Sequence, residues 1–546
     1  MGRLGTQLAI AVGGMLLVTA VLASFGRTAV FAEVPDYGGA YVEGLAGFPA
    51  AINPVLANDD ASHALCALIF TGLVKLDQKG EPVPDLAESW TISPDGKTYT
   101  FVLRANARWQ DGVPVTADDA VYTYKIMQDP QYSGPFGAAW RDVSVEKVDD
   151  RTIKLTLQKG PYAPFLEYTA VGLLPAHLLS SVGARDLPTS RFNVQPVGTG
   201  PFRIKEVQAD LITVEAAPTY YGPKPYLSRI LFRIYPNYKT ILSALEHNEV
   251  EGVPMVDPSD APRVAAEQDV ALYDAPQESL TILFFNNASP ILSDRTVRQA
   301  IAYAIDRQKL IAVARAGHGR PADGPVLPGS WAYTDDMPHY EYDPAKARSL
   351  LDQAGWKLPG ESPGGTRTKG GQPLHLVLLT NDRKERIALA QEIQSELAAV
   401  GFEIEVQATG AGGLVQDFLL PRRYELALYS WDFNGFDPDP YALWHSSQLA
   451  PNGLNVSGFA NRRADDLLDR ARRTTDQQER AKLYADFQRL FAEEVPSLPL
   501  YYPTYLYAIS KKIRGVQPGV VANPADRFRD VVQWYAKTKR EVVGRR

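Results

Sequence analysis

A loop rich in aromatic and acidic side chains carries the strongest chemical signal in the chain. It runs from Tyr429 to Ser447 and reads Tyr-Ser-Trp-Asp-Phe-Asn-Gly-Phe-Asp-Pro-Asp-Pro-Tyr-Ala-Leu-Trp-His-Ser-Ser. Aromatic side chains offer a ligand a large contact surface, and carboxylates accept hydrogen bonds from cations. Two interpretations stay open at this point. The segment is either a turn-rich loop set by its Asp-Pro pairs or a ligand-contacting loop held by a rigid scaffold.

Two pairs of carboxylates have the residue types that a glycoside hydrolase needs. They are Asp118 with Asp119, and Asp437 with Asp439. The first pair opens a predicted helix, where the helix dipole stabilises acidic side chains. The second pair lies beside prolines, where Asp commonly forms turns. Structural roles are therefore expected for both pairs, and no enzyme activity is expected. A secreted hydrolase that works through Asp437 and Asp439 is the remote alternative.

Signatures of metal, nucleophilic and phosphate chemistry are missing from the sequence. The seven histidines are scattered, so no short spacing predicts a metal site. No G-x-S-x-G segment marks a nucleophile. The segment 197–202 (Val-Gly-Thr-Gly-Pro-Phe) lacks the Lys-Ser/Thr of a phosphate-binding loop, and Pro201 favours a strand after it. We expect neither a metal nor a cofactor.

The composition describes an ordinary globular protein of more than one domain. A chain of 546 residues exceeds the size at which single cores stop growing, about 250–300 residues. Its net charge of −7 argues against a nucleic-acid partner, which would require a basic surface. Cys66 is the only cysteine and lies in an apolar run, so it is expected to be buried and inert. The expected state is a monomer.

The first 32 residues have the pattern of an export signal. Arg3 precedes an uncharged run from Leu8 to Gly26, and small residues follow at Ala29 and Ala32. This order is typical of a signal peptide, with cleavage expected after Ala32. The run is nearly as long as the ~20 residues that span a bilayer, so an uncleaved anchor at Leu8–Gly26 is the alternative. Either way, the protein is expected to be extracytoplasmic.

Hydrophobic periodicity predicts the elements that position the 429–447 loop. A short alternating strand, 424–430, leads directly into it. A buried strand at 374–379, a helix at 384–400 and a strand at 402–406 predict a βαβ unit and hence a parallel sheet. Further helices are predicted at 295–314, 464–473 and 477–494, and further strands at 98–104, 151–157, 202–207, 230–235 and 505–509. The chain is therefore of the α/β class, with a β-rich first part.

Motifs spread along most of the chain form a specific series. They are Leu86-Ala-Glu-Ser-Trp90, Asp95-Gly96, Thr100-Phe-Val-Leu-Arg104, Asp111-Gly112, Thr116-Ala-Asp-Asp119, Val197-Gly-Thr-Gly-Pro-Phe202, Tyr220-Tyr-Gly-Pro-Lys-Pro-Tyr226, Val297-Arg-Gln-Ala-Ile-Ala-Tyr-Ala-Ile305 and Tyr342-Asp-Pro-Ala-Lys-Ala347. With the 429–447 loop, this series resembles the family 5 extracytoplasmic solute-binding proteins. That group contains the oligopeptide- and dipeptide-binding proteins of ABC importers.

The resemblance implies a two-lobed periplasmic-binding-protein fold of type II, in the large cluster that has an extra β-rich subdomain. Lobe I would comprise residues 33–281 with this subdomain, lobe II residues 282–505, and residues 506–546 would return to lobe I. A hinge would close the cleft on a small-molecule or peptide ligand. The partner that the resemblance implies is an ABC permease in the membrane, to which the solute would be delivered.

The resemblance also places ligand contacts in the 429–447 loop. The expected ligand-binding residues are Trp431, Asp432, Phe433, Asn434, Phe436 and Asp437. In peptide-binding members, an Asp three positions after the Trp pairs with the peptide's amino group. The matching residue here is Asn434, a neutral donor and acceptor. A peptide stays the first expectation, with Asp432 or a one-residue shift supplying the charge. A short oligosaccharide stacked on the aromatic side chains is the first alternative, and opines, metal chelates and heme are the others.

Overall fold

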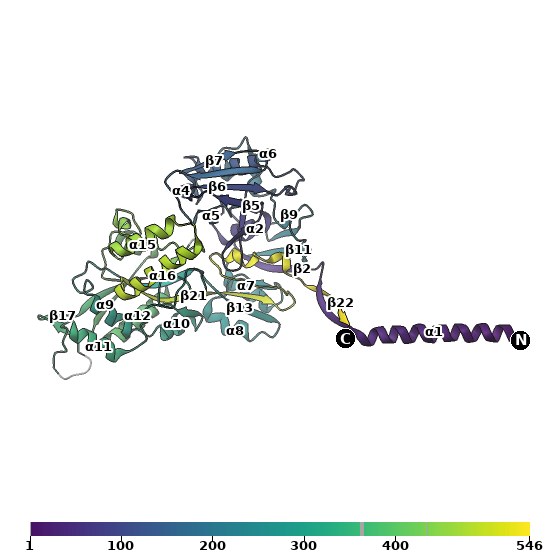
Figure 1. Cartoon of the computed structure of the whole chain (residues 1–546). Coiled ribbons are helices and arrows are strands. Elements are labelled where there is room, and N and C mark those ends of the chain that lie inside the picture. Colours follow the sequence, from purple (N-terminus) through teal and green to yellow (C-terminus); the bar gives the residue numbers. More distant parts are fainter. Residues whose placement is uncertain (1, 361–364, 434, 546) are drawn as a thin grey trace.

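The computed structural model describes residues 2–360, 365–433 and 435–545 of the chain. Two lobes share one continuous β-sheet (Figure 1). The strand order is β19-β18-β20-β14-β21-β12-β2-β11-β10-β9, and β13 and β15 also pair with β21. Strands of lobe II form the first part of this order and strands of lobe I the last part. The structure therefore has the expected two-lobed α/β fold.

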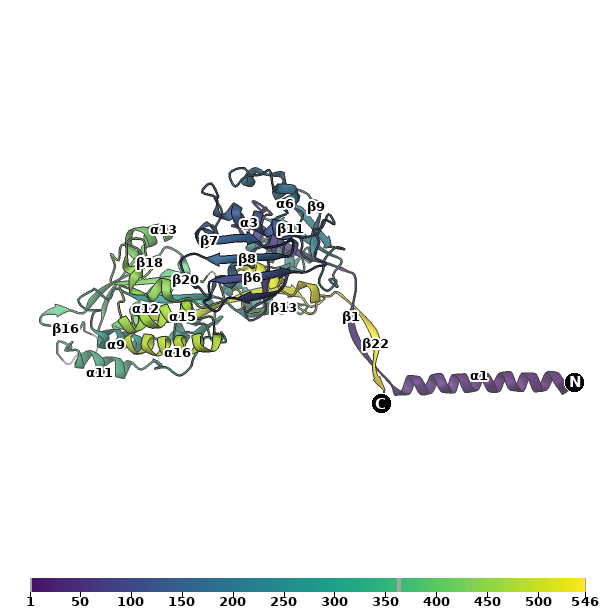
Figure 2. The ribbon, with the colours of Figure 1, turned by 45° about the horizontal axis from the view of Figure 1, so that its top comes forward.

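Lobe I is built on one end of the shared sheet and carries a separate four-stranded sheet as a subdomain (Figure 2). Its main elements are β2 (Ala40–Ala46), β9 (Phe202–Val207), β10 (Leu211–Ala216), β11 (Arg229–Tyr235), β12 (Gly252–Val253), β13 (Val270–Pro276), α2 (Asp60–Ile69), α7 (Tyr238–Glu246) and α8 (Ala261–Ala265). The subdomain contains β5 (Ala87–Ile92), β6 (Thr98–Leu103), β7 (Val143–Lys147), β8 (Thr152–Leu157), α3 (Ala117–Gln128), α4 (Gly137–Trp140), α5 (Phe165–Tyr168) and α6 (Ala176–Leu179).

Lobe II covers the two faces of its part of the sheet with different helices. Its strands are β14 (Ser279–Phe285), β15 (Gly319–Pro321), β18 (His375–Asn381), β19 (Glu403–Thr409) and β20 (Leu426–Asp432). One face packs on α9 (Arg295–Ala304), α10 (Arg307–Arg315), α11 (Pro344–Gln353) and α12 (Lys384–Ala398). The other face packs on α14 (Tyr441–Trp444), α15 (Arg462–Arg473) and α16 (Gln477–Glu494).

Two segments cross between the lobes. β21 (Ser497–Ser510) is buried along its whole length, pairs with β14 in lobe II and continues beside β13 in lobe I. The other crossing is the short link Gln277–Glu278, which joins β13 to β14. The domain limits expected from the sequence, 281/282 and 505/506, fall within β14 and β21. The lobes are therefore joined at two places, by β21 and by the Gln277–Glu278 link.

The predicted βαβ unit is confirmed. β18 and β19 are parallel and are joined by α12. The predicted helix over 295–314 was wrong in its continuity, because the chain forms α9 and α10 with a break at Ile305 and Asp306. The Asp306 carboxylate accepts hydrogen bonds from the N–H groups of Gln308 and Lys309 and so caps a new helix. An Asp side chain that accepts hydrogen bonds from the following backbone N–H groups favours the start of a helix over its interior.

Gly401 ends the helix of this unit, and its replacement provides a test of the fold. Its φ of +103° lies in the left-handed region, and an added Cβ would lie 2.6 Å from Cγ of Arg367. We expect Gly401→Ala to lower the free energy of unfolding by at least about 1–2 kcal/mol, measured by urea denaturation. Gly410→Ala is the matched control, because its Cβ would meet nothing within 4 Å. Equal stability of the two variants would contradict this account of Gly401.

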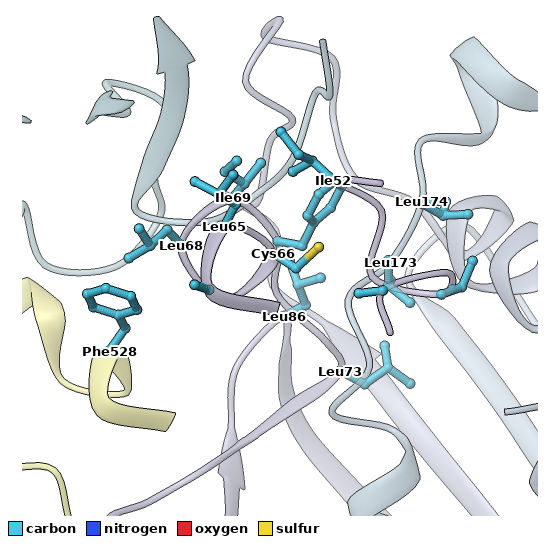
Figure 3. Packing of buried hydrophobic residues seen from close by; sticks show 14 of the residues in the cluster. Ile52, Leu65, Cys66, Leu68, Ile69, Leu73, Leu86, Leu173, Leu174 and Phe528 are labelled. Carbon is cyan, nitrogen blue, oxygen red and sulfur yellow. The ribbon is translucent and has the colours of Figure 1, made fainter. Parts of the chain in front are cut away.

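Apolar side chains from distant parts of the chain meet in the core of lobe I. Cys66 is buried among Leu65, Leu86 and Leu173 (Figure 3), as the sequence predicted. Phe528, near the C-terminal end of the chain, packs in the same core. The segment after β21 therefore stabilises lobe I by burying its own apolar side chains.

A long N-terminal helix, α1 (Gly2–Thr28), projects away from both lobes (Figures 1 and 2). It leads into β1 (Ala29–Asp36), which pairs with the C-terminal strand β22 (Lys537–Arg545). The predicted cleavage point after Ala32 lies inside β1. Within the described ranges, no helix has both the length and the apolar character that crossing a membrane requires. Signal cleavage and anchoring at Leu8–Gly26 stay predictions.

Candidate ligand-binding site between the lobes

The predicted contact loop begins at the junction of the two lobes. β18 and β20 are parallel, so their carboxyl ends lie at the same edge of the sheet, and ligands of open α/β sheets bind outside such strand ends. Asp432, the last residue of β20, pairs with Ser279 of β14. The N–H of Phe433 then donates to the carbonyl of Glu278 at 3.0 Å. The loop is therefore fastened to the segment that links the lobes.

The predicted contact residues at the start of the loop differ in exposure. Trp431 and Phe433 are half-buried and pack against the core of lobe II, whereas Asp432 is exposed. Asn434 lies outside the described residues. An aromatic surface beside an exposed carboxylate can contact both apolar and cationic parts of a ligand. A role for these residues in ligand binding stays a prediction.

Phe436 and Asp437, also predicted as ligand contacts, hold the loop in place. Phe436 is buried, and a Cβ added to Gly80 of lobe I would lie 2.3 Å from its Cβ. Both carboxylate oxygens of Asp437 accept hydrogen bonds from the guanidinium of Arg480 on α16, Oδ2 at 2.7 Å from Nη1. A ligand role for these two residues would come in addition to the structural one.

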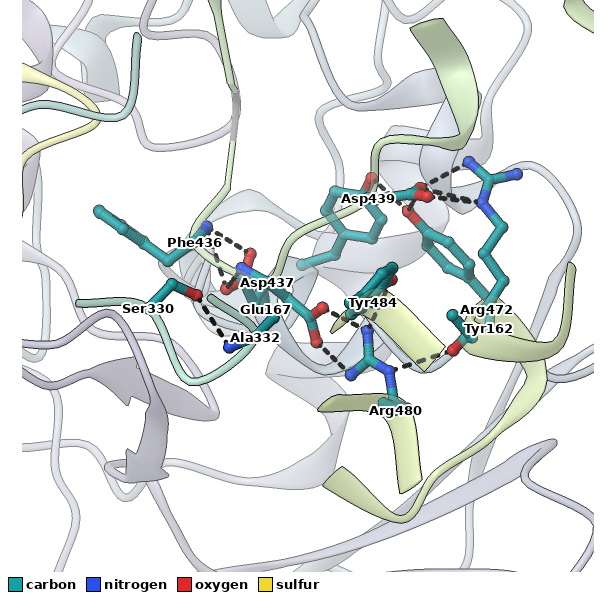
Figure 4. A network of polar contacts seen from close by, with 12 residues as sticks. Tyr162, Glu167, Ser330, Ala332, Phe436, Asp437, Asp439, Arg472, Arg480 and Tyr484 are labelled. Carbon is teal, nitrogen blue, oxygen red and sulfur yellow. Dashed lines mark hydrogen bonds and ion pairs between the residues drawn. The ribbon is translucent and has the colours of Figure 1, made fainter. Parts of the chain in front are cut away.

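Hydrogen bonds join the loop to the subdomain of lobe I (Figure 4). Glu167 on α5 accepts hydrogen bonds from the N–H of Phe436 at 3.1 Å and from the N–H of Asp437 at 2.5 Å. The carboxylate of Asp439 accepts one from the hydroxyl of Tyr162 at 3.1 Å and one from Nε of Arg472 at 2.8 Å. We call the contacts that Glu167 and Tyr162 make with the loop the inter-lobe seam. They tie both lobes together at one side of the junction.

Two carboxyl groups beside the loop have raised pKa values and are therefore mostly uncharged at pH 7. Burial, with the nearby charge of Asp437, raises the pKa of Glu167 to about 8. Burial raises the pKa of Glu278 to about 8. Glu278 lies on the link between the lobes and its backbone binds Phe433. A cation brought next to either carboxyl group would favour its charged form.

The raised pKa of Glu278 predicts a pH dependence of stability. An unfolded Glu has a pKa of about 4.3, so between that pH and about 8 the folded protein binds more protons than the unfolded one. The stability that this group contributes is therefore lost as pH rises through about 8. We expect the melting temperature of the wild type to fall relative to that of Glu278→Gln between pH 5 and pH 9. Glu267→Gln, at an exposed site of lobe I, is the control, and parallel curves for wild type and Glu278→Gln would refute the prediction.

The carboxylate pairs considered for hydrolysis are occupied by partners within the fold. Asp119 accepts hydrogen bonds from the N–H of Ala176 at 2.8 Å and from the indole of Trp109 at 3.1 Å. Asp118 pairs with Lys147 at 2.8 Å. With Asp437 and Asp439 bound to arginines, both pairs have the structural roles that were expected. Of the described residues, no three His, Cys, Asp or Glu side chains come together as a metal-binding group.

Periodicity and motifs did not identify Glu167 or Glu278 as part of this site. Glu167 lies 269 residues before Phe436 in the chain, and neither acid belongs to a motif that the sequence singled out. Glu278 does lie next to the start of β14, a strand of mostly apolar residues. An acidic residue directly before a mostly apolar strand is the local signal that could have identified Glu278.

Comparison with known proteins identifies a family for most of the chain. Residues 81–452 match the model for bacterial extracellular solute-binding proteins, family 5 Middle. The oligopeptide-binding protein AppA of Bacillus subtilis is 31% identical over 88% of this chain and 89% of its own length. The dipeptide-binding protein of Escherichia coli is 29% identical over 86% of this chain and 90% of its own.

Solved structures agree with these sequence matches. The structure of AppA from Bacillus subtilis in complex with a nonapeptide has a TM-score of 0.67 and 28% identity, covering 92% of this chain and 99% of that one. The match extends over both lobes and the segments that link them, because nearly all of both chains is aligned. The present chain belongs to the bacterial extracellular solute-binding proteins, family 5.

Proposed function

We propose that this protein is the extracytoplasmic substrate-binding component of an ABC importer, which captures a peptide or similar small polar solute and delivers it to a membrane permease. The support comes from relatives named for oligopeptides and dipeptides that align over most of the chain. The observation that carries the proposal is the aromatic, acid-bearing loop at the junction of the lobes, fastened to the link between them. A loop in this position meets any solute enclosed there.

Capture works through closure of the lobes. A solute that touches both lobes only in the closed form shifts the population toward that form. Moving a protein from 1:99 to 99:1 in favour of closure takes about 5.5 kcal/mol of differential binding energy. Trp431 and Phe433 supply apolar contact for this purpose, and Asp432 is the exposed carboxylate beside them.

Glu278 is our candidate for the partner of a ligand's ammonium group. The position three after Trp431 is Asn434, which carries no charge. Glu278 lies directly beside the same loop, and burial raises its pKa to about 8. An ammonium would stabilise the charged form of this carboxyl group and would itself be neutralised on burial.

The proposal is tested by the ligand that the protein binds. Native mass spectrometry of protein purified from its native host identifies the ligand that it carries. A thermal-shift assay then measures how much peptides of two to nine residues raise the melting temperature. Ligand at 100 times Kd stabilises a protein by about 2.7 kcal/mol, so a clear rise in melting temperature is expected, reduced in Trp431→Ala. Stabilisation by oligosaccharides alone would favour the sugar-binding alternative. Turnover of glycosides that Asp437→Asn abolishes would instead show a hydrolase.

A further inference from the structure

Phe436 is a buried aromatic side chain that belongs to the apolar core of neither lobe. Only 6% of its surface is exposed, yet it is not among the described side chains that build the four apolar clusters. Trp431 and Phe433, in the same loop, pack on the core of lobe II instead. The burial of Phe436 therefore comes from contacts outside these cores.

Lobe I covers Phe436 with two pieces of its own chain. One is the turn between β3 (Val74–Leu76) and β4 (Pro82–Pro84), where a Cβ added to Gly80 would overlap Cβ and Cγ of Phe436. The other is Arg529, whose guanidinium carbon lies 4.9 Å from the centre of the ring. We call Gly80 and Arg529 the Phe436 socket.

Arg529 is fixed within lobe I and attracts the ring. Its Nη1 donates to the carbonyl of Val520 at 2.9 Å, and its Nη2 lies 3.1 Å from the carboxylate of Asp526. A guanidinium over the face of an aromatic ring is attracted to it, more strongly when both are out of water. Both sides of the socket thus belong to lobe I, whereas Phe436 belongs to a loop of lobe II.

Further contacts between the same two bodies extend along the junction (Figure 4). Glu167 accepts hydrogen bonds from N–H groups of the loop, and Tyr162 donates one to Asp439. The N–H of Ala163 donates to the carbonyl of Arg472, on α15, at 2.8 Å. In each case the subdomain supplies one partner and lobe II supplies the other.

The subdomain moves with lobe I because the two share one apolar core. Phe101 on β6 and Leu155 on β8 belong to the same buried cluster as Phe232 on β11. The helices α15 and α16 share a different cluster with β14 and β20 of lobe II. Close-packed cores behave as units. Lobes that part must therefore withdraw Phe436 from its socket and break the seam.

We propose that Phe436 and its socket, together with the inter-lobe seam, form a latch that favours the closed lobes before any solute is bound. This inference rests on the opening and closing of the lobes in the proposed function. It adds that Gly80, Glu167 and Arg529 are positioning residues, which set the affinity without touching the solute. A ligand that binds only the closed form has an apparent Kd equal to its intrinsic Kd divided by the closed fraction.

Gly80→Ala tests the socket, and Gly112→Ala is its matched control. Both glycines have a positive φ, +83° and +94°, and each N–H donates to the carbonyl three residues earlier in a turn. A Cβ on Gly112 would meet nothing within 4 Å, whereas a Cβ on Gly80 would take the place of Phe436. The two variants share the backbone strain of a left-handed alanine, and only Gly80→Ala displaces the ring.

Double electron–electron resonance measures the separation of the lobes in the full chain without ligand. Spin labels at Gln158→Cys in the subdomain and Gln353→Cys in lobe II are exposed, and the buried Cys66 stays unlabelled. Because burial of a Phe side chain favours the closed form, we expect Gly80→Ala to lower the ratio of closed to open molecules about 10-fold or more. Gly112→Ala should leave this ratio within about 2-fold of the wild type. Equal ratios in both variants, or a wild type that is open without ligand, would overturn the latch.

Glu167 provides a second test with a conservative rescue. Glu167→Ala removes the acceptor for the N–H groups of Phe436 and Asp437, so the closed-to-open ratio should fall. Glu167→Gln keeps an acceptor oxygen and should stay near the wild type. A purely structural Glu167 would change the melting temperature in Glu167→Ala and leave the distances between the labels unchanged.

The outcomes separate this inference from the proposed function. In calorimetric titrations with trialanine, the apparent Kd should rise in inverse proportion to the closed fraction. If peptides of two to nine residues do not bind but Gly80→Ala opens the lobes, the latch stands and peptide capture fails. If peptides bind and the label distances are the same in every variant, peptide capture stands and the latch is refuted.

Discussion

Replacing Arg527 by Met is expected to lower the free energy of unfolding by about 3–5 kcal/mol. Arg527 and Glu43 are both almost completely buried, and Nε of Arg527 donates to Oε1 of Glu43 at 2.8 Å. Met leaves the Glu43 carboxylate without its cationic partner in the core of lobe I, where an uncompensated charge is expensive. Denaturation by urea, followed by tryptophan fluorescence, measures the loss.

Two further variants test whether the loss of stability comes from the buried ion pair. Glu43→Leu combined with Arg527→Met removes both charges and should recover most of the lost stability, because apolar residues can replace a buried pair at little cost. Arg514→Met is the surface control, since Arg514 and its partner Glu33 are more than half exposed and such pairs contribute about 0–1 kcal/mol. A loss in Arg514→Met as large as that in Arg527→Met would contradict the assigned role of the buried pair.

Replacing Arg480 by Met is expected to release the 429–447 loop and to cost about 3–5 kcal/mol of stability. Arg480 is buried on α16, binds both carboxylate oxygens of Asp437 and lies 4.8 Å from the ring of Trp331. Without it, Asp437 is a buried charge with no cation, and the backbone that carries Phe436 toward Glu167 loses its support. Thermal unfolding measures the stability, and ligand titration measures the affinity.

The loss of affinity distinguishes this variant from a general destabilisation. Arg489→Met, on the same helix, removes a pair with Asp336 that is largely exposed, and it should change neither stability nor affinity by much. Arg480→Met with Asp437→Asn removes both charges and should recover part of the stability. Unchanged ligand affinity in Arg480→Met would show that the loop does not need the seam to bind.

Local patterns predicted much of the fold because they act over a few residues. Alternation and apolar runs predicted the βαβ unit formed by β18, α12 and β19, and Gly401 marked the helix end. The same patterns missed the break between α9 and α10. That break depends on Asp306 capping a new helix, a local hydrogen bond that hydrophobic spacing does not report.

Motif order predicted the two-lobed fold and the family, and it drew attention to the loop after β20. It did not predict which acidic residues of that loop pair with cations inside the fold. Asp437 looked like a ligand contact from its position, whereas Arg480, 43 residues further on, takes up its carboxylate. Which acid stays available to a ligand depends on which cations the fold brings beside it.

The sequence by itself determined the class of protein, the βαβ unit and the buried cysteine, and it singled out the 429–447 loop. Each of these depends on residue type and short spacing. Tertiary structure alone decided that Glu167 receives the loop across the seam and that the carbonyl of Glu278 accepts a hydrogen bond from Phe433. The physical reason is that pairing and burial of charges depend on distances in space between residues far apart in the chain, to which short sequence patterns do not respond.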